Sequence, residues 1–217
     1  MSSAPLVVLE DIELAAVGSK PRKRLTLEVE EGCFLLISGA NGLGKSYVLN
    51  LIAGLVLPEK GRVLLSGKNA ADLSEGVRAA WRRRIGFIPA KDTLLPGYSV
   101  RENLELAAQA CDVPADKMLP RIQEAMTVCG VSSIADRRIE TLSAGQKKRA
   151  LVARSLVNRP QIILADSPLE SLDSKFRKEL LMMLSQLPEL GYTVVLTSAA
   201  PLKIQSEKLR AVSLGDY

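Results

Sequence analysis

The sequence predicts an α/β domain with an inserted helical subdomain, on two observations. Apolar segments of strand length alternate with segments of helical apolar spacing, and three consecutive helical segments interrupt that alternation between residues 100 and 158. The chain has 217 residues, of which 47% are hydrophobic, so it is long enough to bury the core of one domain. We therefore expect a single domain over residues 1–217, with its helical subdomain at about 91–158.

Each element follows from its own local pattern. Short apolar segments predict strands at 6–9, 24–29, 33–38, 62–67, 85–90, 162–166, 193–198 and 209–214. Apolar residues at helical spacing predict helices at 45–55, 100–110, 116–130, 144–157 and 172–187. Outside the helical subdomain, strands and helices alternate, which is the order typical of an α/β domain.

Charge and hydropathy exclude several classes of protein. The net charge of +5 is too small and too dispersed to indicate a nucleic-acid-binding protein. No apolar run approaches the roughly 18 residues of a transmembrane helix. The N-terminus meets acidic residues before any positive charge, unlike a signal peptide. The sequence thus predicts a soluble, cytoplasmic protein.

Histidine and cysteine usage excludes further chemistry. The chain contains no histidine, so imidazole is excluded as a general base, a proton shuttle or a metal ligand. The three cysteines (Cys33, Cys111 and Cys129) have neither the paired spacing of a zinc site nor the even number of a disulfide framework. We expect them to be reduced and buried as small hydrophobic side chains.

Residues 39–46, GANGLGKS, form the first motif that carries chemistry. They fit the phosphate-loop pattern G-x-x-x-x-G-K-[ST] and lie between a predicted strand and a predicted helix, as that motif requires. Glycines let backbone N–H groups converge on phosphate oxygens at a helix N-terminus. Lys45 would reach the β- and γ-phosphates, and Ser46 would bind Mg²⁺. The predicted cofactor-binding residues of this loop are Gly39, Asn41, Gly42, Gly44, Lys45, Ser46 and Tyr47.

A phosphate loop alone fits a kinase, a GTPase or a motor protein, and two downstream motifs separate these classes. Residues 142–146 read LSAGQ before a predicted helix, and Asp166 ends the apolar strand IILA. With these motifs the whole chain resembles the nucleotide-binding subunit of an ATP-binding-cassette (ABC) transporter, whose signature is LSGGQ and whose Walker B strand ends in Asp-Glu-Pro. Segments 85–104 and 163–173 are most similar to the lipoprotein-release, macrolide-export and cell-division branch, and 196–214 also resembles the haem-exporter ATPase.

This resemblance implies an ABC-ATPase fold with an antiparallel β subdomain, and a set of roles. ATP and Mg²⁺ would be the cofactors, with Ser46 and Asp166 as the Mg²⁺ ligands. ATP would lie between two cassettes, so a second cassette and a transmembrane subunit are the expected partners, at the inner face of the cell membrane. The residues that would contact the nucleotide of the second cassette are Ser143, Gly145, Gln146 and Asp173. An alternative for LSAGQ by itself is an ordinary helix N-cap at Ser143.

The sequence departs from the family pattern where hydrolysis is performed. Ser167 stands at the position of the catalytic glutamate, Ala199 at that of the switch histidine and Ala90 at that of the Q-loop glutamine. No aromatic residue precedes Phe34, so the ring that stacks on adenine in relatives is missing. A general base contributes about 10²–10⁴-fold to a rate, and serine does not replace it. Nearby Glu170 is read more simply as a solvated loop charge than as a substitute base, and the same holds for Asp92.

These observations predict an ATP-binding subunit of an ABC-type membrane complex. Its own site would hydrolyse ATP poorly, while its signature would complete the site of an intact partner cassette. One alternative is a regulatory ATP clamp, a homodimer that closes on ATP without pumping. A soluble ABC protein acting on nucleic acid is disfavoured, because a long coiled coil, a second cassette and a basic extension are missing from the sequence.

Two surface segments leave their role open. The basic run from Trp81 to Arg84 is read as a solvated helix end in preference to a lipid-headgroup contact. Leu94, Leu95, Pro96 and Tyr98 lie where relatives receive the coupling helix of the membrane subunit, and local packing is an equal alternative.

Overall fold

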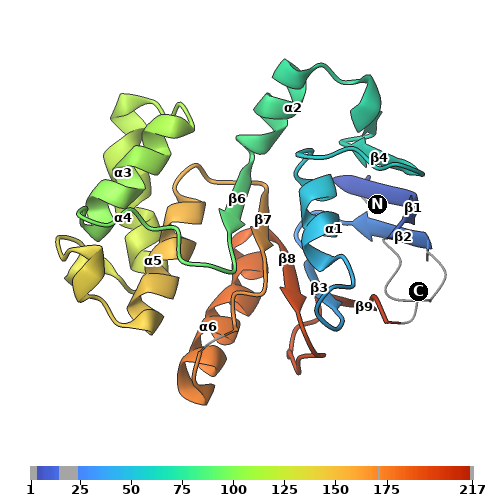
Figure 1. Ribbon diagram of the computed structural model, residues 1–217. Helices are drawn as coiled ribbons and strands as arrows, with labels where there is room; N and C mark the ends of the chain where they lie inside the picture. Colours follow the sequence, from blue (N-terminus) through green and yellow to red (C-terminus); the bar gives the residue numbers. More distant parts are fainter. Residues whose placement is uncertain (1–3, 15–23, 171, 216–217) are drawn as a thin grey trace.

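The structure is a computed structural model that describes residues 4–14, 24–170 and 172–215. Three groups of elements lie side by side (Figure 1). Helices α3 (Val100–Ala110), α4 (Ala115–Val128) and α5 (Ala144–Leu156) gather at one end, and we call them the helical lobe. An antiparallel sheet forms the other end, and a parallel sheet lies between them.

The antiparallel sheet has the strand order β2-β1-β4-β5. Its strands are β1 (Val7–Glu13), β2 (Arg24–Val29), β4 (Arg62–Leu65) and β5 (Lys68–Asn69). The first strand was expected to end at Leu9 but continues, because a bulge at Asp11 (φ 54°) shifts the register and returns Ile12 to the buried face. The strand expected at 62–67 ends at Leu65, because positive φ at residues 66 and 67 (47° and 76°) makes a hairpin turn into β5, which was not predicted.

The parallel sheet has the order β6-β7-β8-β3-β9. Its strands are β3 (Phe34–Ser38), β6 (Ile85–Ile88), β7 (Ile162–Ala165), β8 (Thr193–Ser198) and β9 (Leu209–Ser213). All four neighbouring pairs are parallel, so the carboxyl ends of the strands share one edge. Ligands of open α/β sheets bind at that edge, and the residues that follow β3, β7 and β8 therefore come together there.

The remaining helices are capped by short polar or glycine residues. Helix α1 (Lys45–Ile52) ends before Gly54 (φ 64°), three residues earlier than expected. Helix α6 (Ser174–Gln186) begins two residues later than expected, because Asp173 is its N-cap. Helix α2 (Glu75–Arg82) is capped by Ser74. Its bounds were not predicted, although the run from Trp81 to Arg84 was expected to be a helix end. Short 3₁₀ helices cover Ala70–Asp72, Ser132–Ile134, Ile139–Thr141 and Leu187–Leu190.

The position of Trp81 distinguishes between the two roles considered for the basic run at the end of α2, a helix end and a lipid contact. Its side chain is buried, and its Nε1 donates to the backbone oxygen of Ile52 at 2.9 Å. Arg84 stacks over the ring, 5.3 Å from its centroid. The indole thus joins α2 to α1 and is not available to a lipid surface.

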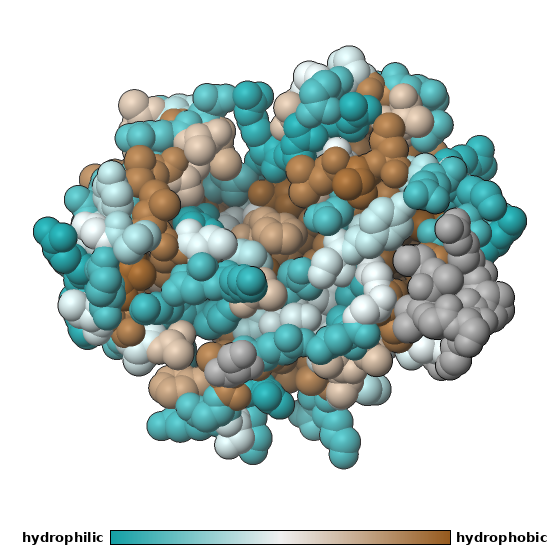
Figure 2. Space-filling view, viewed as in Figure 1, coloured by the Kyte–Doolittle hydropathy of each residue, from teal (hydrophilic) through white to brown (hydrophobic). Residues whose placement is uncertain are grey.

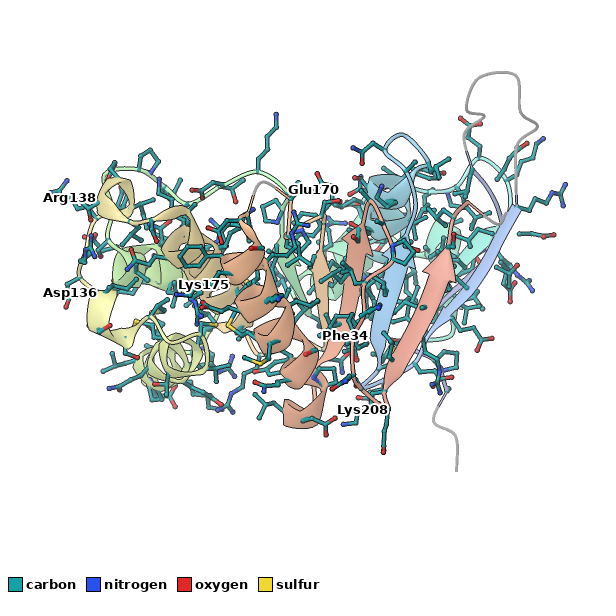
Figure 3. The ribbon with its side chains drawn as sticks, turned by 90° about the horizontal axis from the view of Figure 1, so that it is seen from below. Phe34, Asp136, Arg138, Glu170, Lys175 and Lys208 are labelled. Atoms are coloured by element: carbon teal, nitrogen blue, oxygen red, sulfur yellow. The ribbon has the colours of Figure 1, made fainter. Side chains whose placement is uncertain are left out.

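The core consists of two apolar layers, one on each face of the parallel sheet. Along β3, Phe34 and Leu36 pack toward α6 and the helical lobe, while Leu35 and Ile37 pack toward α1 and the antiparallel sheet. Figure 3 shows Phe34 at the side of the sheet where α6 lies. Cys33 and Cys129 are buried free thiols, as expected, whereas Cys111 is only partly buried. Within the described ranges, every helix is too short or too polar to cross a bilayer.

Candidate functional site

The phosphate-loop segment joins β3 to α1 at the carboxyl edge of the parallel sheet. The Gly39 amide donates to the backbone oxygen of Ser198 at 3.1 Å, which fixes the start of the loop against β8. Gly44 is the N-cap of α1 in a left-handed conformation (φ 88°), which favours glycine. The Val48 amide bonds Gly44 O at 3.0 Å, and the N–H groups before it belong to the first turn, which lacks intrahelical partners. The loop thus presents donors to an anion.

Lys45 brings a cation into this loop. Its side chain is 6% exposed, and its Nζ donates to the backbone oxygens of Gly39 at 2.6 Å and Ala40 at 3.0 Å. A buried lysine is rare unless it is paired, and here carbonyl oxygens pair it across the loop. A cavity of about 390 Å³ opens beside it, lined by Asn41, Gly42, Gly44, Lys45, Ser46, Tyr47, Ala90, Asp166, Ser167 and Glu170. This cradle suits phosphate oxygens.

Ser46 and Asp166 form the oxygen pair of the site. The Ser46 hydroxyl donates to Asp166 Oδ2 at 2.8 Å, although the two residues belong to different elements. Mg²⁺ binds few protein oxygens and keeps several waters when it accompanies phosphates. One hydroxyl and one carboxylate beside a phosphate cradle therefore fit Mg²⁺ together with a nucleotide triphosphate.

Thr197 orients this pair and was missed in the sequence. It is fully buried in β8, and its hydroxyl donates to Asp166 Oδ1 at 3.0 Å while it accepts the Ser167 amide at 2.8 Å. The only sequence signal was a threonine inside the apolar strand TVVLTS. Because its hydroxyl occupies Oδ1, Asp166 presents Oδ2 to Ser46.

The three positions at which the sequence predicts the loss of hydrolytic groups lie at the same edge. Ala90 and Ser167 line the cavity, and Ala199 follows directly on Ser198, whose backbone oxygen bonds the start of the loop. Ser167 is 8% exposed and has φ 44°, which is unusual for a residue with a side chain.

Glu170 lies at the cavity around Lys45. It belongs to the cavity lining, and its amide donates to the Ser167 backbone oxygen at 3.2 Å. It also lines an adjoining cavity of about 330 Å³ together with Asp92 and Lys148. Figure 3 shows Glu170 between α1 and the helical lobe. Its side chain is exposed, in agreement with a solvated charge.

The LSAGQ segment begins α5 with a capping box. Ser143 Oγ accepts the Gln146 amide at 3.2 Å, and Gln146 Oε1 accepts the Ser143 amide at 3.0 Å. Ser143 is therefore the N-cap of α5. Because its hydroxyl oxygen accepts this bond, its hydroxyl hydrogen is still available to donate. Gly145 is buried, because the Phe176 ring covers it.

Asp173 plays a comparable local role. Its Oδ1 accepts the amides of Lys175 at 2.9 Å and Phe176 at 3.0 Å at the start of α6. In the described part of the chain, neither Asp173 nor residues 143–146 line the cavity around Lys45. One chain thus brings together the loop and Asp166 in one cavity, whereas the signature residue Ala144 lines the adjoining cavity with Ala90 and Glu170.

A phosphate loop at the carboxyl edge of a parallel sheet, with a serine–aspartate oxygen pair, defines a P-loop nucleotide-binding protein. Residues 22–170 match the family model described as ABC transporter. The chain belongs to this family and is an ABC transporter ATP-binding domain, with an ABC-ATPase fold.

Relatives in the family have different roles. The chain is 35% identical over 187 residues to an uncharacterised ABC transporter ATP-binding protein of Thermotoga maritima, covering 86% of this chain and 80% of the relative. It is 34% identical to the spermidine/putrescine import protein PotA of Hahella chejuensis (90% and 52%). It is 33% identical to the macrolide export protein MacB of Brucella melitensis (92% and 32%). The chain thus spans about half of PotA and a third of MacB, and importers and exporters are equally similar to it.

Solved structures agree with the fold. The ATP-binding cassette MJ0796, in a dimeric post-hydrolysis state bound to ADP and Pi, superposes with a TM-score of 0.74 at 32% identity, covering 88% of this chain and 87% of that one. The cassette cbiO1 of Clostridium perfringens, part of the transporter complex cbiONQ, gives a TM-score of 0.83 at 23% identity (98% and 86%). The second likeness supports the fold alone.

Proposed function

We propose that this chain is the ATP-binding subunit of an ABC-type membrane complex whose own site binds Mg-ATP but hydrolyses it poorly. The proposal rests on a difference between two groups of residues that line the same cavity. Lys45, Ser46 and Asp166 retain the geometry for phosphate and Mg²⁺, whereas Ala90 and Ser167 in the same lining lack the groups that act on water.

Binding would use the groups already in place. Phosphate oxygens would replace the Gly39 and Ala40 carbonyls as partners of the Lys45 ammonium, and the N–H groups at the start of α1 would donate to them. When bound, Mg²⁺ would supply positive charge against the triphosphate, held by Ser46 and Asp166. Thr197 would keep the Asp166 carboxylate in its orientation.

Hydrolysis requires a group that takes a proton from the attacking water. Ser167 brings a neutral hydroxyl to the position of the family glutamate, and the Ala90 methyl group forms no hydrogen bond. The loss of a general base alone costs about 10²–10⁴-fold in rate. This site, which we call the silent site because it would bind ATP but hydrolyse it poorly, would still contribute to closure of the dimer around ATP.

The signature would act on the nucleotide of a second cassette. Ser143 is exposed at the N-terminus of α5 and keeps a hydroxyl hydrogen to donate. The free amides of that helix turn favour a phosphate. The dimeric state of the similar cassette MJ0796 supports pairing of cassettes. We propose an intact cassette as the partner, since a homodimer of this chain would contain two sites without a base.

A membrane subunit would cover exposed apolar side chains. Leu94 is buried and serves local packing, but Leu95 and Tyr98 are 44% and 45% exposed. Leu55, Val56 and Leu57 are also exposed after α1, and Figure 2 shows apolar surface over the end of α1 below α2. Exposed apolar patches mark interaction sites. This arrangement would place the chain at the cytoplasmic face of the membrane.

An asymmetry between two variants in the assembled complex tests the proposal. Ser143→Arg should nearly abolish ATP turnover, because it blocks the competent site in the partner. Lys45→Ala should leave more activity, because it damages only the silent site and the closure that it supports. Ser132→Arg, on an exposed serine of the 3₁₀ helix that follows α4, controls for the added charge. If Ser143→Arg is harmless in an active complex, the heterodimer is rejected and the regulatory homodimer is the better account.

A further inference from the structure

Tyr47 places an aromatic ring in the lining of the nucleotide cavity. It is the third residue of α1 and directly follows Ser46, the proposed Mg²⁺ ligand. The ring packs against the apolar layer between α1 and the antiparallel sheet, and its hydroxyl interacts with the backbone of Glu59. The side chain is partly buried. Tyr47 is thus held by this packing and at its hydroxyl, and it also borders the cavity.

The other lining residues leave the nucleoside without an apolar partner. Among the described residues of the cavity lining, Tyr47 is the single aromatic one, and the others are glycine, alanine, polar or charged. Residues 1–33 contain no aromatic side chain in the sequence. Lys45, Ser46 and Asp166 account for phosphate and Mg²⁺, but none of them offers a flat apolar surface to a base.

We propose that Tyr47 is a nucleoside-positioning residue whose ring stacks against the nucleobase of bound ATP. The inference rests on the proposed function, since it requires ATP with its phosphates on the loop. Aromatic stacking accepts any base, because every base has a π-face. Removal of a stacking ring costs about 5- to 160-fold in affinity, and that loss should be confined to ligands that carry a base.

Calorimetric titration with two ligands separates this role from a structural one. Mg-ATP carries a base, and Mg-tripolyphosphate carries the phosphates alone. Tyr47→Leu keeps an apolar side chain against the layer under α1 but has no ring, and Tyr47→Phe keeps the ring without the hydroxyl. We expect Tyr47→Leu to weaken Mg-ATP binding about 5- to 160-fold and Mg-tripolyphosphate binding less than about twofold. Tyr47→Phe should bind both ligands within about threefold of the wild type.

A second readout observes the contact itself. Nuclear Overhauser effects between adenine H8 and tyrosine ring protons are expected in the wild type and should be lost in Tyr47→Leu. Equal weakening of both ligands, no weakening of either, or no adenine–tyrosine contact would overturn the inference. A wild-type chain that binds neither ligand would overturn the proposed function as well. The two failures are therefore distinguishable.

Discussion

The Lys148 ammonium donates a hydrogen bond to the backbone oxygen of Ala90, and the two atoms are 2.8 Å apart. Lys148 lies on α5, whereas Ala90 lies in the segment that leaves the parallel sheet after β6. Farther along α5, Arg154 donates to the backbone oxygen of Thr93 at 2.7 Å. Residues Ala90 and Thr93 are thus bonded through their backbone oxygens to helix α5.

This link makes a prediction about local opening. Burial lowers the pKa of Lys148, and the nearby Asp92 carboxylate opposes that shift. The hydrogen bond to Ala90 O adds a partner for the partly buried ammonium. Replacing Lys148 by Met removes that bond, and a bond of about 1 kcal/mol corresponds to about a fivefold change in opening. We expect the amides of residues 91–95 to exchange hydrogen about five times faster in Lys148→Met, measured by mass spectrometry. Lys147→Met removes a neighbouring charge without removing this bond, and equal exchange in the two variants would contradict the prediction.

Gly145 gives a second prediction, on the stability of the signature. A Cβ atom at this position would lie 2.4 Å from Cδ1 of Phe176. Overpacking of this kind costs about 1–3 kcal/mol, so Gly145→Ala should lower the free energy of unfolding by that amount in urea titrations. Adding Phe176→Leu should recover part of the loss. Gly76→Ala in α2 is the control, because a Cβ atom there would meet only Ser74 Oγ, at an ordinary contact distance of 3.9 Å, and alanine favours a helix. A neutral Gly145→Ala would show that the ring moves freely.

The sequence predicted the parts of the fold that have strong local signals. Residues 100–110 form a helix with the expected bounds, because a Ser99–Glu102 capping box starts it. The bounds of helix α2 were not predicted, because it has only eight residues, with a glycine and two arginines among them. The two-residue strand β5 is too short to show any alternation.

Site residues could be predicted where a single sequence segment forms a motif. They could not be predicted where their role depends on contacts between two segments. The phosphate loop and Asp166 follow from motifs at the ends of apolar strands. Thr197 contributes only because β7 and β8 are parallel neighbours in register, and the need for glycine at 145 comes from Phe176 on another helix. Neither fact can be read from residues adjacent in the sequence.

The cysteines provide a third prediction, on reactivity. Burial raises the pKa of the Cys129 thiol to about 12 and also raises the pKa of Cys111, which is partly accessible. Only the thiolate reacts with alkylating agents, and the raised pKa keeps the Cys129 thiol protonated at pH 8. At pH 8, N-ethylmaleimide should modify Cys111 well before Cys129, and urea should remove the difference. Peptide mass spectrometry measures both, with Cys111→Ser as the control. Equal rates in the folded chain would contradict the buried position of Cys129.

The last prediction concerns turnover by the chain alone. We expect Lys45-dependent ATP hydrolysis to be barely measurable, and Ser167→Glu to raise it less than about tenfold, although a general base can contribute about 10²–10⁴-fold. When catalytic groups act together, restoring only one of them recovers little of the rate. In Ser167→Glu, Ala90 and Ala199 would still be unchanged. Position 167 adds a local reason, because it is 8% exposed with φ 44°, so a longer side chain enters a tight and strained place.

A phosphate-release assay with Lys45→Ala in each background separates this site from contaminating activity. The triple variant Ala90→Gln, Ser167→Glu, Ala199→His should exceed Ser167→Glu alone, because it restores all three groups. Robust Lys45-dependent turnover by the unmodified chain would overturn the silent-site proposal. Another base would then be needed, and Glu170→Gln is the first variant to measure, because Glu170 lines the cavity with Lys45 and Asp166.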